Sequence, residues 1–282
     1  MYQQNNELKT SQTTRDLQLA SLSLLTAIDT VCRQHGFTYY LIAGTLLGAV
    51  RHGGFIPWDD DMDIGMPRKD YDLLMQHAQE WLPKPFRIVN HENDAHYPKY
   101  FAKIENTDTT LIENKHLGYV GGIYCDIFAL DNVPDSLWRR RLHYTKFNLV
   151  RRLLYLAYRN PYKHGRGPSS WLPLIVQKCF SKPQLHRWAQ RLLHKYSDRE
   201  CQNVMTFDDG FRAFPKTVLG KPQRITFEGI EANAPADTDR FLSIMYGPNY
   251  MTPPPEGQRR EHGHYYFDTN TPYSEFQQRH SL

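Results

Sequence analysis

The chain has 282 residues, of which 40% are hydrophobic and 23% charged, as in ordinary globular proteins. Its formal net charge of +4 is too small to indicate a nucleic-acid-binding protein. The sequence contains no run of about 18 apolar residues, so we expect no transmembrane helix. The polar N-terminus lacks the pattern of a signal peptide. The four scattered cysteines form no CxxC pair, which excludes a simple zinc module, so we expect reduced thiols in a cytoplasmic protein.

The first part of the chain predicts a flexible end, a helix and a strand. Residues 1–13 are polar and are expected to be flexible, whereas residues 14–282 suit a single catalytic domain. Apolar residues recur at helical spacing over residues 14–35, and Gly36 follows where a helix would end. The aromatic and aliphatic residues 39–43 then predict a strand.

A Gly-Thr pair follows this strand. Gly44 lets the backbone approach a ligand, and the start of the next helix, with the Thr45 hydroxyl, offers hydrogen-bond donors to a phosphate. Arg51 and His52 come about two helical turns later and would add positive charge near the same anion. The pattern therefore predicts a phosphate-binding turn.

Four aspartates follow closely in the sequence. If residues 58–65 are extended, Asp59, Asp61 and Asp63 share one face of the strand, and Asp60 points to the other. Three carboxylates on one face repel each other unless a cation lies between them. Mg²⁺ takes oxygen ligands and commonly binds one or two carboxylates together with substrate phosphates. The stretch therefore predicts a site for Mg²⁺, or for Mn²⁺ in its place.

These motifs also carry a family resemblance. The stretch GTLLGAVRHGGFIPWDDDMDI, residues 44–64, resembles the signature of the LicD family, which includes bacterial phosphocholine transferases and is related to the fukutin-type ribitol-phosphate transferases. The resemblance implies an α+β fold, the nucleotidyltransferase fold of polymerase β, with a mixed-sheet core and surrounding and appended helices. It implies that Asp61 and Asp63 are the catalytic, metal-binding Asp-x-Asp pair. We expect Asp59 and Asp60 either to supply a third metal ligand or to support the ligands from behind.

The next segments predict a helix and two strands. A helix is expected to begin after Pro67, and strands are expected over residues 86–90 and 100–104. Lys103 lies on the second strand and could face a phosphate, although a lone lysine on a strand has no necessary function. Similar family members also carry a lysine before a Thr-containing turn, which favours a role in binding.

A third acid is expected on a later strand. Asp126 lies in the apolar run of residues 121–131, where an ionised carboxylate would cost several kcal/mol unless it is paired or bound to a metal. The family resemblance places the third catalytic acid in this motif, and we assign it to Asp126. Asp131 is the alternative, although it can equally be a turn residue or a helix N-cap.

Residues 136–158 alternate basic and apolar side chains at helical spacing. Such a helix can lie against the inner membrane surface or an anionic glycolipid acceptor. The alternative is a solvated face on an ordinary surface helix. Residues 171–200 predict one or two further helices without evident chemistry.

The C-terminal part predicts smaller elements. Residues 205–215 suggest a strand and a turn, and residues 208–210 are interpreted as the turn rather than as a metal site. A hairpin is expected around residues 227–229, and a helix with an acidic first turn over residues 237–247.

A proline-rich segment resembles the C-terminal motif of the family. Its three consecutive prolines fix an extended path that could bring Arg259, Arg260 and His262 over the site as ligands of a phosphate or of the acceptor. With this motif the resemblance extends over most of residues 16–265.

The resemblance and the carboxylates together predict a phosphotransferase. We expect a nucleotidyltransferase-like core over about 36–135, a helical insertion over about 136–200 and a C-terminal segment over 201–282. Two Mg²⁺ ions would be held by the three catalytic aspartates and clamp a CDP-linked donor, from which a phospho-alcohol passes to a hydroxyl of a cell-envelope glycan or glycolipid with release of CMP.

Choline phosphate is the leading cargo by resemblance, and the acceptor would be lipopolysaccharide, teichoic acid or capsule. Trp58 is a candidate for a choline pocket, since aromatic faces bind quaternary ammonium groups. Ribitol, glycerol and ethanolamine phosphate are alternatives, as is a nucleotidyltransferase that makes the activated donor. A non-catalytic glycan-binding protein is a remote alternative.

Overall fold

The computed structural model describes residues 11–259 and 263–280. Within these ranges the helices are α1 (Thr14–His35), α2 (Ala43–His52), α3 (Arg68–Trp81), α4 (Leu137–Tyr158), α5 (Pro168–Cys179), α6 (Lys182–Leu193), α7 (Lys216–Leu219), α8 (Thr238–Tyr246) and α9 (Tyr273–His280). The strands are β1 (Tyr40–Leu41), β2 (Asp63–Pro67), β3 (Phe86–Val89), β4 (Ala102–Ile112), β5 (Gly121–Val133), β6 (Asn203–Met205), β7 (Phe214–Pro215), β8 (Gln223–Phe227), β9 (Ile230–Ala234) and β10 (Tyr266–Asp268).

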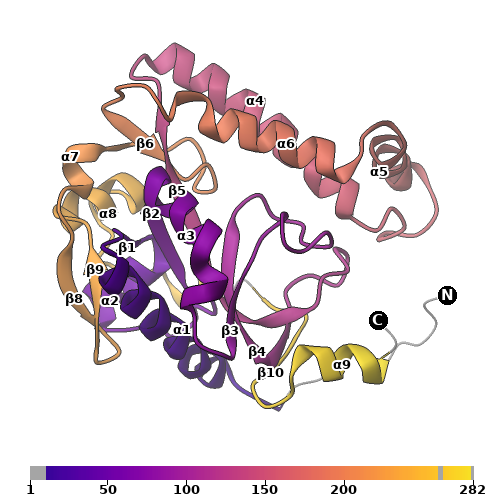
Figure 1. Cartoon of the computed structure of the whole chain (residues 1–282), viewed down its shortest axis with the longest axis horizontal. Helices are drawn as coiled ribbons and strands as arrows, with labels where there is room; N and C mark the ends of the chain where they lie inside the picture. The colour runs from indigo at the N-terminus through magenta and orange to yellow at the C-terminus, as the bar shows by residue number, and fades with distance from the viewer. Residues whose placement is uncertain (1–10, 260–262, 281–282) are drawn as a thin grey trace.

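A mixed sheet forms the centre of the molecule (Figure 1). Its main order is β1-β2-β5-β4-β10, with β2 and β5 parallel and the other neighbours antiparallel. β3 pairs with β4, and β6 joins β5 to β7. The predicted α+β class, a mixed sheet with surrounding helices, is confirmed.

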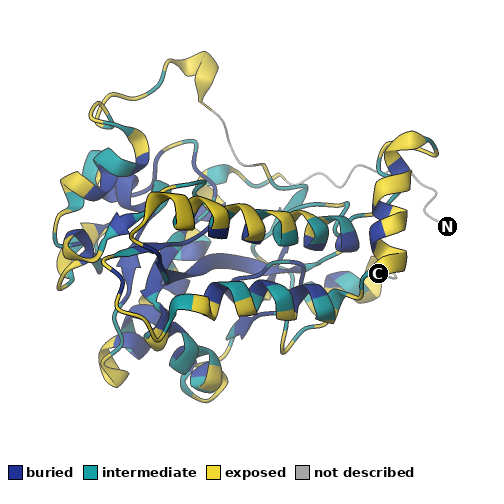
Figure 2. Cartoon of the chain, turned by 90° about the horizontal axis from the view of Figure 1, so that it is seen from above, coloured by how far each residue is buried: buried dark blue, intermediate teal, exposed yellow. Residues whose placement is uncertain are grey.

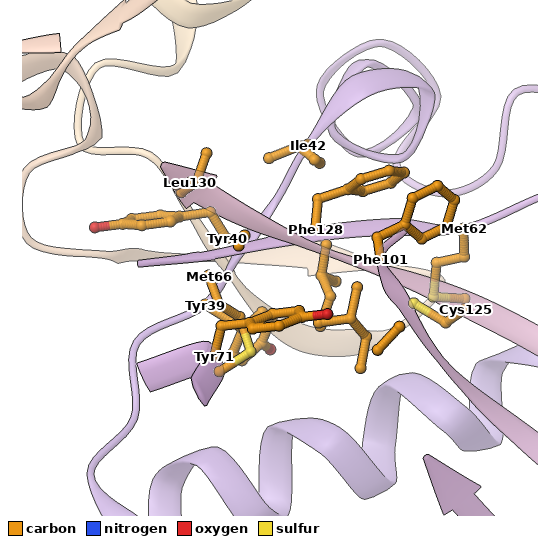
Figure 3. Packing of buried hydrophobic residues seen from close by; sticks show 14 of the residues in the cluster. Tyr39, Tyr40, Ile42, Met62, Met66, Tyr71, Phe101, Cys125, Phe128 and Leu130 are labelled. Carbon is orange, nitrogen blue, oxygen red and sulfur yellow. The ribbon is translucent and has the colours of Figure 1, made fainter. Parts of the chain in front are cut away.

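The predicted first helix is confirmed for local reasons, whereas the strand predicted over residues 39–43 is shorter, because β1 holds only Tyr40–Leu41 and α2 already begins at Ala43. α1 begins with a capping box between Thr13 and Asp16 and ends at Gly36, whose φ of 72° suits glycine. Both α1 and α3 pack against β5. Figure 3 shows buried side chains packed around strands of the central sheet, among them Tyr40 of β1, Met66 of β2 and Phe128 of β5.

The predicted strand over residues 58–65 is wrong in its first half, because β2 begins only at Asp63. The backbone N–H of Asp59 instead donates to Ile56 O in a turn. The Gln18 amide on α1 donates to the carbonyl oxygens of both Ile56 and Asp59, which holds the turn against the helix. A hydrogen-bonded turn, held to α1 by the Gln18 side chain, therefore replaces the first half of the expected strand.

The strand predicted to end at residue 104 continues as β4 to Ile112, with an irregularity between Asn106 and Leu111. The hairpin expected around residues 227–229 is confirmed: β8 and β9 are joined by Glu228 and Gly229, which have φ values of 50° and 77°. The helix expected over 237–247 is α8.

The helices expected within 136–200 are α4, α5 and α6. α4 and α6 lie side by side along one edge of the molecule, and α5 stands at its far end (Figure 1). The chain then returns to the sheet, because β6 pairs with β5 and β10 pairs with β4. Across the described ranges, no helix combines the length and apolarity needed to cross a bilayer.

Candidate active site

A cleft of about 1000 Å³ lies where β2 and β5 meet the start of α2, one side of α4 and the segment after α8. Its walls bring together acidic side chains that are far apart in the sequence. They are Asp59, Asp61, Asp63, Glu113, Asp126, Asp208 and Asp209. Cleft volumes of this size suit a ligand as large as a nucleotide conjugate.

Asp63 and Asp126 form the centre of this acidic group. They are direct partners in the parallel register of β2 and β5, and the Asp126 N–H donates to Met62 O at 2.8 Å. Burial, the charge of Asp61 and the charge of Asp126 raise the pKa of Asp63 well above its usual value. Burial likewise raises the pKa of Asp126 to about 6, although the Lys103 ammonium opposes the rise. Two carboxylates held this close favour a cation between them.

The alternation predicted for the aspartates holds although most of them precede the strand. Asp59, Asp61 and Asp63 all line the cleft. Asp60 instead faces the C-terminal segment, where its carboxylate accepts a hydrogen bond from Gly263 N at 3.0 Å and lies 3.6 Å from His264 Nε2. Asp60 therefore holds the C-terminal segment beside the cleft.

The alternative third acid, Asp131, lies away from the cleft. Its two carboxylate oxygens accept hydrogen bonds from Arg68 Nε and Nη2 at 2.6 and 2.8 Å, and both residues are buried. Asp131 therefore joins α3 to β5, and only Asp126 of the two candidates faces Asp63.

Lys103 lies behind Asp126 rather than on the wall of the main cleft. Its Nζ is 3.2 Å from Asp126 Oδ1 and 2.9 Å from Glu113 Oε2, and it lies over the ring of Tyr124. Glu113 also binds Lys99 at 2.5 Å, and both of these residues line the cleft. The structure therefore places Lys99, which the sequence did not single out, where Lys103 was expected.

The carboxylates around Asp63 and Asp126 are chemically suited to bind a divalent cation. Asp126 Oδ1 is buried and has no hydrogen-bond partner among the described residues, although Lys103 contacts it as an ion pair. The neighbouring ligand atoms are carboxylate oxygens, the type that Mg²⁺ and Mn²⁺ prefer. No three His, Cys, Asp or Glu side chains in the described part of the chain already converge as a metal site. The carboxylates would therefore have to rotate toward a bound ion.

Gly44 and Thr45 each help to position an aspartate of the cleft. A Cβ on Gly44 would come within 2.3 Å of Asp59 Oδ2, so the missing side chain makes room for that carboxylate at the start of α2. Thr45 is buried, and its Oγ1 accepts a hydrogen bond from Asp63 N at 2.8 Å. Thr45 thus fixes the first residue of β2, while Gly44 and the preceding Ala43 line the cleft.

Of the basic pair Arg51 and His52, only Arg51 lines the cleft. Arg51 lines the cleft, and its Nη1 donates to Tyr250 O at 3.0 Å. His52 is exposed, lies edge-on to Trp58 and is not among the residues that line the cleft. The tight turn after α2 directs it outward, so the structure does not bring His52 to the proposed phosphate.

The C-terminal segment reaches the cleft. Arg259 places its guanidinium over the Trp58 ring, 4.6 Å from the ring centre, and so occupies an aromatic face that was a candidate for choline. His264, which the sequence did not single out, lines the cleft. Arg260 and His262 lie outside the described residues.

Sequence reasoning also missed residues from distant elements. Asp208 and Asp209 do form a turn, but this turn lines the cleft, and Arg151 of α4 binds Asp208 at 3.0 Å. Arg152 and Tyr155 of α4 line the cleft as well. The Asp-Asp pair was the available signal for the turn, whereas no local pattern distinguishes Arg151 from the other arginines of α4.

Comparison with known proteins finds sequence similarity to one family. Residues 36–149 match the family model described as LicD/FKTN/FKRP, nucleotidyltransferase domain. The chain is 27% identical to lipopolysaccharide cholinephosphotransferase LicD of Haemophilus influenzae, over 89% of this chain and 96% of that protein.

Two shorter matches accompany it. An uncharacterized protein of Rickettsia prowazekii is 34% identical over 37% of this chain and 36% of its own length. Ribitol 5-phosphate transferase FKRP of Homo sapiens is 54% identical over 35 residues, which are 12% of this chain and 7% of that protein. Residues 36–149 are therefore similar to the LicD/FKTN/FKRP family, and the chain resembles the Haemophilus protein along nearly its whole length.

Proposed function

We propose that this chain transfers a phospho-alcohol, first of all phosphocholine from CDP-choline, to a hydroxyl of a cell-envelope glycan with release of CMP. The observation that carries the proposal is the pairing of Asp63 with Asp126 in one acidic cleft. The similarity to a cholinephosphotransferase over 96% of that protein's length supports this choice of reaction. We also interpret the sheet as a nucleotidyltransferase core.

In this proposal Asp61, Asp63 and Asp126, with Asp59 beside them, would hold two Mg²⁺ or Mn²⁺ ions. The chemistry that such ions supply when bound is to offset negative charge on the phosphates and on the entering and leaving oxygens. Asp126 is our candidate to accept the proton of the acceptor hydroxyl.

The chain's own cations would bind the diphosphate of the donor. Arg51, Lys99 and Arg152 line the same cleft as the carboxylates. Guanidinium groups bind phosphate oxygens through paired hydrogen bonds, which orients the donor as well as attracting it. Exclusion of water by a closed donor complex would then favour transfer to the glycan over hydrolysis.

Aromatic side chains in the cleft suit a quaternary ammonium. Besides Trp58, whose face Arg259 covers, Tyr155, Tyr246 and Tyr250 line the cleft. Cation–π contact with such rings stabilises a choline group by roughly 0.5–2 kcal/mol. Ribitol-phosphate transfer is the second candidate, because the 35-residue match to the human ribitol 5-phosphate transferase is 54% identical.

The test is a donor panel. Purified chain is incubated with CDP-choline, CDP-ethanolamine, CDP-glycerol or CDP-ribitol, with Mg²⁺ or with a chelator. Without a glycan acceptor, the phospho-alcohol passes slowly to water, and the CMP released by this hydrolysis is measured. We expect Mg²⁺-dependent CMP formation that is fastest with CDP-choline. Pyrophosphate release from CTP and a phospho-alcohol would instead indicate a nucleotidyltransferase. Absence of metal-dependent nucleotide binding in calorimetry would indicate a glycan-binding protein.

A further inference from the structure

The charge of this chain is distributed very unevenly. Residues 136–197, which include α4, α5 and α6, contain 14 Lys and Arg residues and no Asp or Glu. The whole chain has 34 Lys and Arg and 30 Asp and Glu, so the remainder holds 20 basic and 30 acidic residues. A net charge of +4 therefore conceals a strongly basic helical part on an acidic body.

The helix α5 exposes large apolar side chains to solvent, unlike an ordinary surface helix. Ser170, Pro173 and Val176 are buried against the rest of the chain. Trp171, Leu172 and Ile175 point outward and are 63%, 56% and 57% exposed. An ordinary surface helix buries its apolar stripe and exposes polar residues. In Figure 2, where exposed residues are yellow, much of α5, the helix at the right of the view, is exposed.

Cations lie at both ends of α5. Lys163 and Arg166 lie in the segment that leads into α5, and Lys178 is an exposed residue of its last turn. α4 repeats the pattern, since Trp138 and Leu149 are 70% and 60% exposed on a helix with several arginines. Exposed tryptophan and leucine beside lysine and arginine are the combination found in helices that lie in a membrane interface.

We propose that the outward face of α5 binds the surface of an anionic phospholipid bilayer. Trp171, Leu172 and Ile175 enter the boundary between headgroups and acyl chains, and the lysines and arginines of residues 136–197 attract the anionic headgroups. The 12 residues of α5 are far fewer than the roughly 20 needed to span a bilayer, so the helix lies along the surface.

Charge decides between a membrane and a second copy of the chain as the occupant of this face. Two copies joined through α5 would bring two basic helical parts together without an acidic residue in either to compensate. An anionic bilayer supplies the opposite charge over the whole face, at about 1 kcal/mol for each Lys or Arg near the surface. This inference does not depend on the proposed transfer reaction.

The first experiment is co-sedimentation of the full chain with phospholipid vesicles free of glycan. We expect binding to vesicles of phosphatidylcholine mixed with phosphatidylglycerol, weaker binding to phosphatidylcholine alone, and loss of binding at high salt. The double variant Trp171→Gln/Ile175→Gln should bind at least about tenfold more weakly, because two large apolar side chains no longer leave water. Leu19→Gln is the matched control, since Leu19 is 49% exposed on α1.

A second measurement uses the cysteine at the end of α5. Cys179 is exposed, whereas Cys32, Cys125 and Cys201 are buried, so an environment-sensitive fluorophore can be attached there alone. The labelled chain should report an apolar environment with anionic vesicles, and the labelled double variant should not. Vesicle binding equal in the double variant and the wild type would overturn the proposal, as would a dimer that covers α5 and excludes vesicles.

Discussion

At the scale of single residues, the site depends on two aspartates that backbone pairing holds together. Asp63 begins β2 and Asp126 lies in the middle of β5, and their parallel register places them side by side. Burial and neighbouring carboxylates raise the pKa of both. Residues kept in such an unfavourable electrostatic environment are usually functional, because stability alone would favour neutral side chains.

Asp63→Asn should separate function from stability. Removing one carboxylate relieves repulsion in the cleft, so we expect the melting temperature to stay constant or to rise. Removing one electrostatic group from an active site typically lowers turnover on the order of 100-fold, and CMP release in the donor panel measures this. Asp108→Asn, at an exposed position of β4, is the control. Full activity in Asp63→Asn would contradict the proposed site.

Gly44→Ala tests how tightly Asp59 is placed. The new Cβ would meet Asp59 Oδ2 at 2.3 Å, so the carboxylate must move. We expect a loss of about 1–3 kcal/mol in the free energy of unfolding and a fall in turnover of up to about 100-fold, as displacement of a reacting group can cause. A Cβ on Gly257 meets nothing within 4 Å, so Gly257→Ala should leave both measurements unchanged.

At the scale of elements, α3 is attached to the sheet by a buried ion pair. Arg68, at the first position of α3, binds both oxygens of Asp131 on β5. The same guanidinium reaches Asp72 at 3.1 Å, and Asp72 is 3.2 Å from His194, which directly follows α6. One network therefore joins α3, a central strand and the end of α6.

Arg68→Met should destabilise the chain by about 3–5 kcal/mol, because it leaves the Asp131 carboxylate buried without a partner. Unfolding in urea, followed by tryptophan fluorescence, measures the change. The double variant Arg68→Met/Asp131→Leu should recover most of the lost stability, since no unpaired charge remains. Equal destabilisation in the single and double variants would show that packing rather than charge is responsible. Lys69→Met, at the exposed neighbouring position, is the control.

At the scale of the whole molecule, the helices α4 and α6 pack against the loop after β3 through a buried histidine. The His186 ring on α6 stacks on His91 at a distance of 4.4 Å between ring centres, and its Nε2 lies 3.1 Å from Tyr158 Oη on α4. Burial, together with the charges of the nearby His91 and Lys182, lowers the pKa of His186 to about 3. The folded chain therefore holds this imidazole neutral.

Acid should weaken this packing. Below pH 6.5, the usual pKa of histidine, the unfolded chain takes up a proton at His186 that the folded chain does not bind. The free energy of unfolding should fall by up to about 1.4 kcal/mol per pH unit from this group, down to its folded pKa of about 3. Urea midpoints between pH 7 and pH 5 should decline less steeply for His186→Gln than for the wild type. Parallel curves would exclude His186 as the cause.

The linear sequence was sufficient for features that depend on neighbours along the chain. The capping box and Gly36 set the limits of α1, the Glu228-Gly229 turn set the β8–β9 hairpin, and the acidic cluster marked one half of the site. Each of these rests on periodicity, turn chemistry or a local motif, which a single segment contains in full.

Only the tertiary structure decided which acids and cations share the cleft. Asp126 rather than Asp131 faces Asp63 because of strand register, and Lys99 replaces Lys103 on the wall because Lys103 is buried beneath Asp126 and Glu113. The approach of Asp208 and of α4 depends on packing between segments far apart in the chain. Such contacts are set by which surfaces meet when the chain folds, and no local pattern in the sequence records that choice.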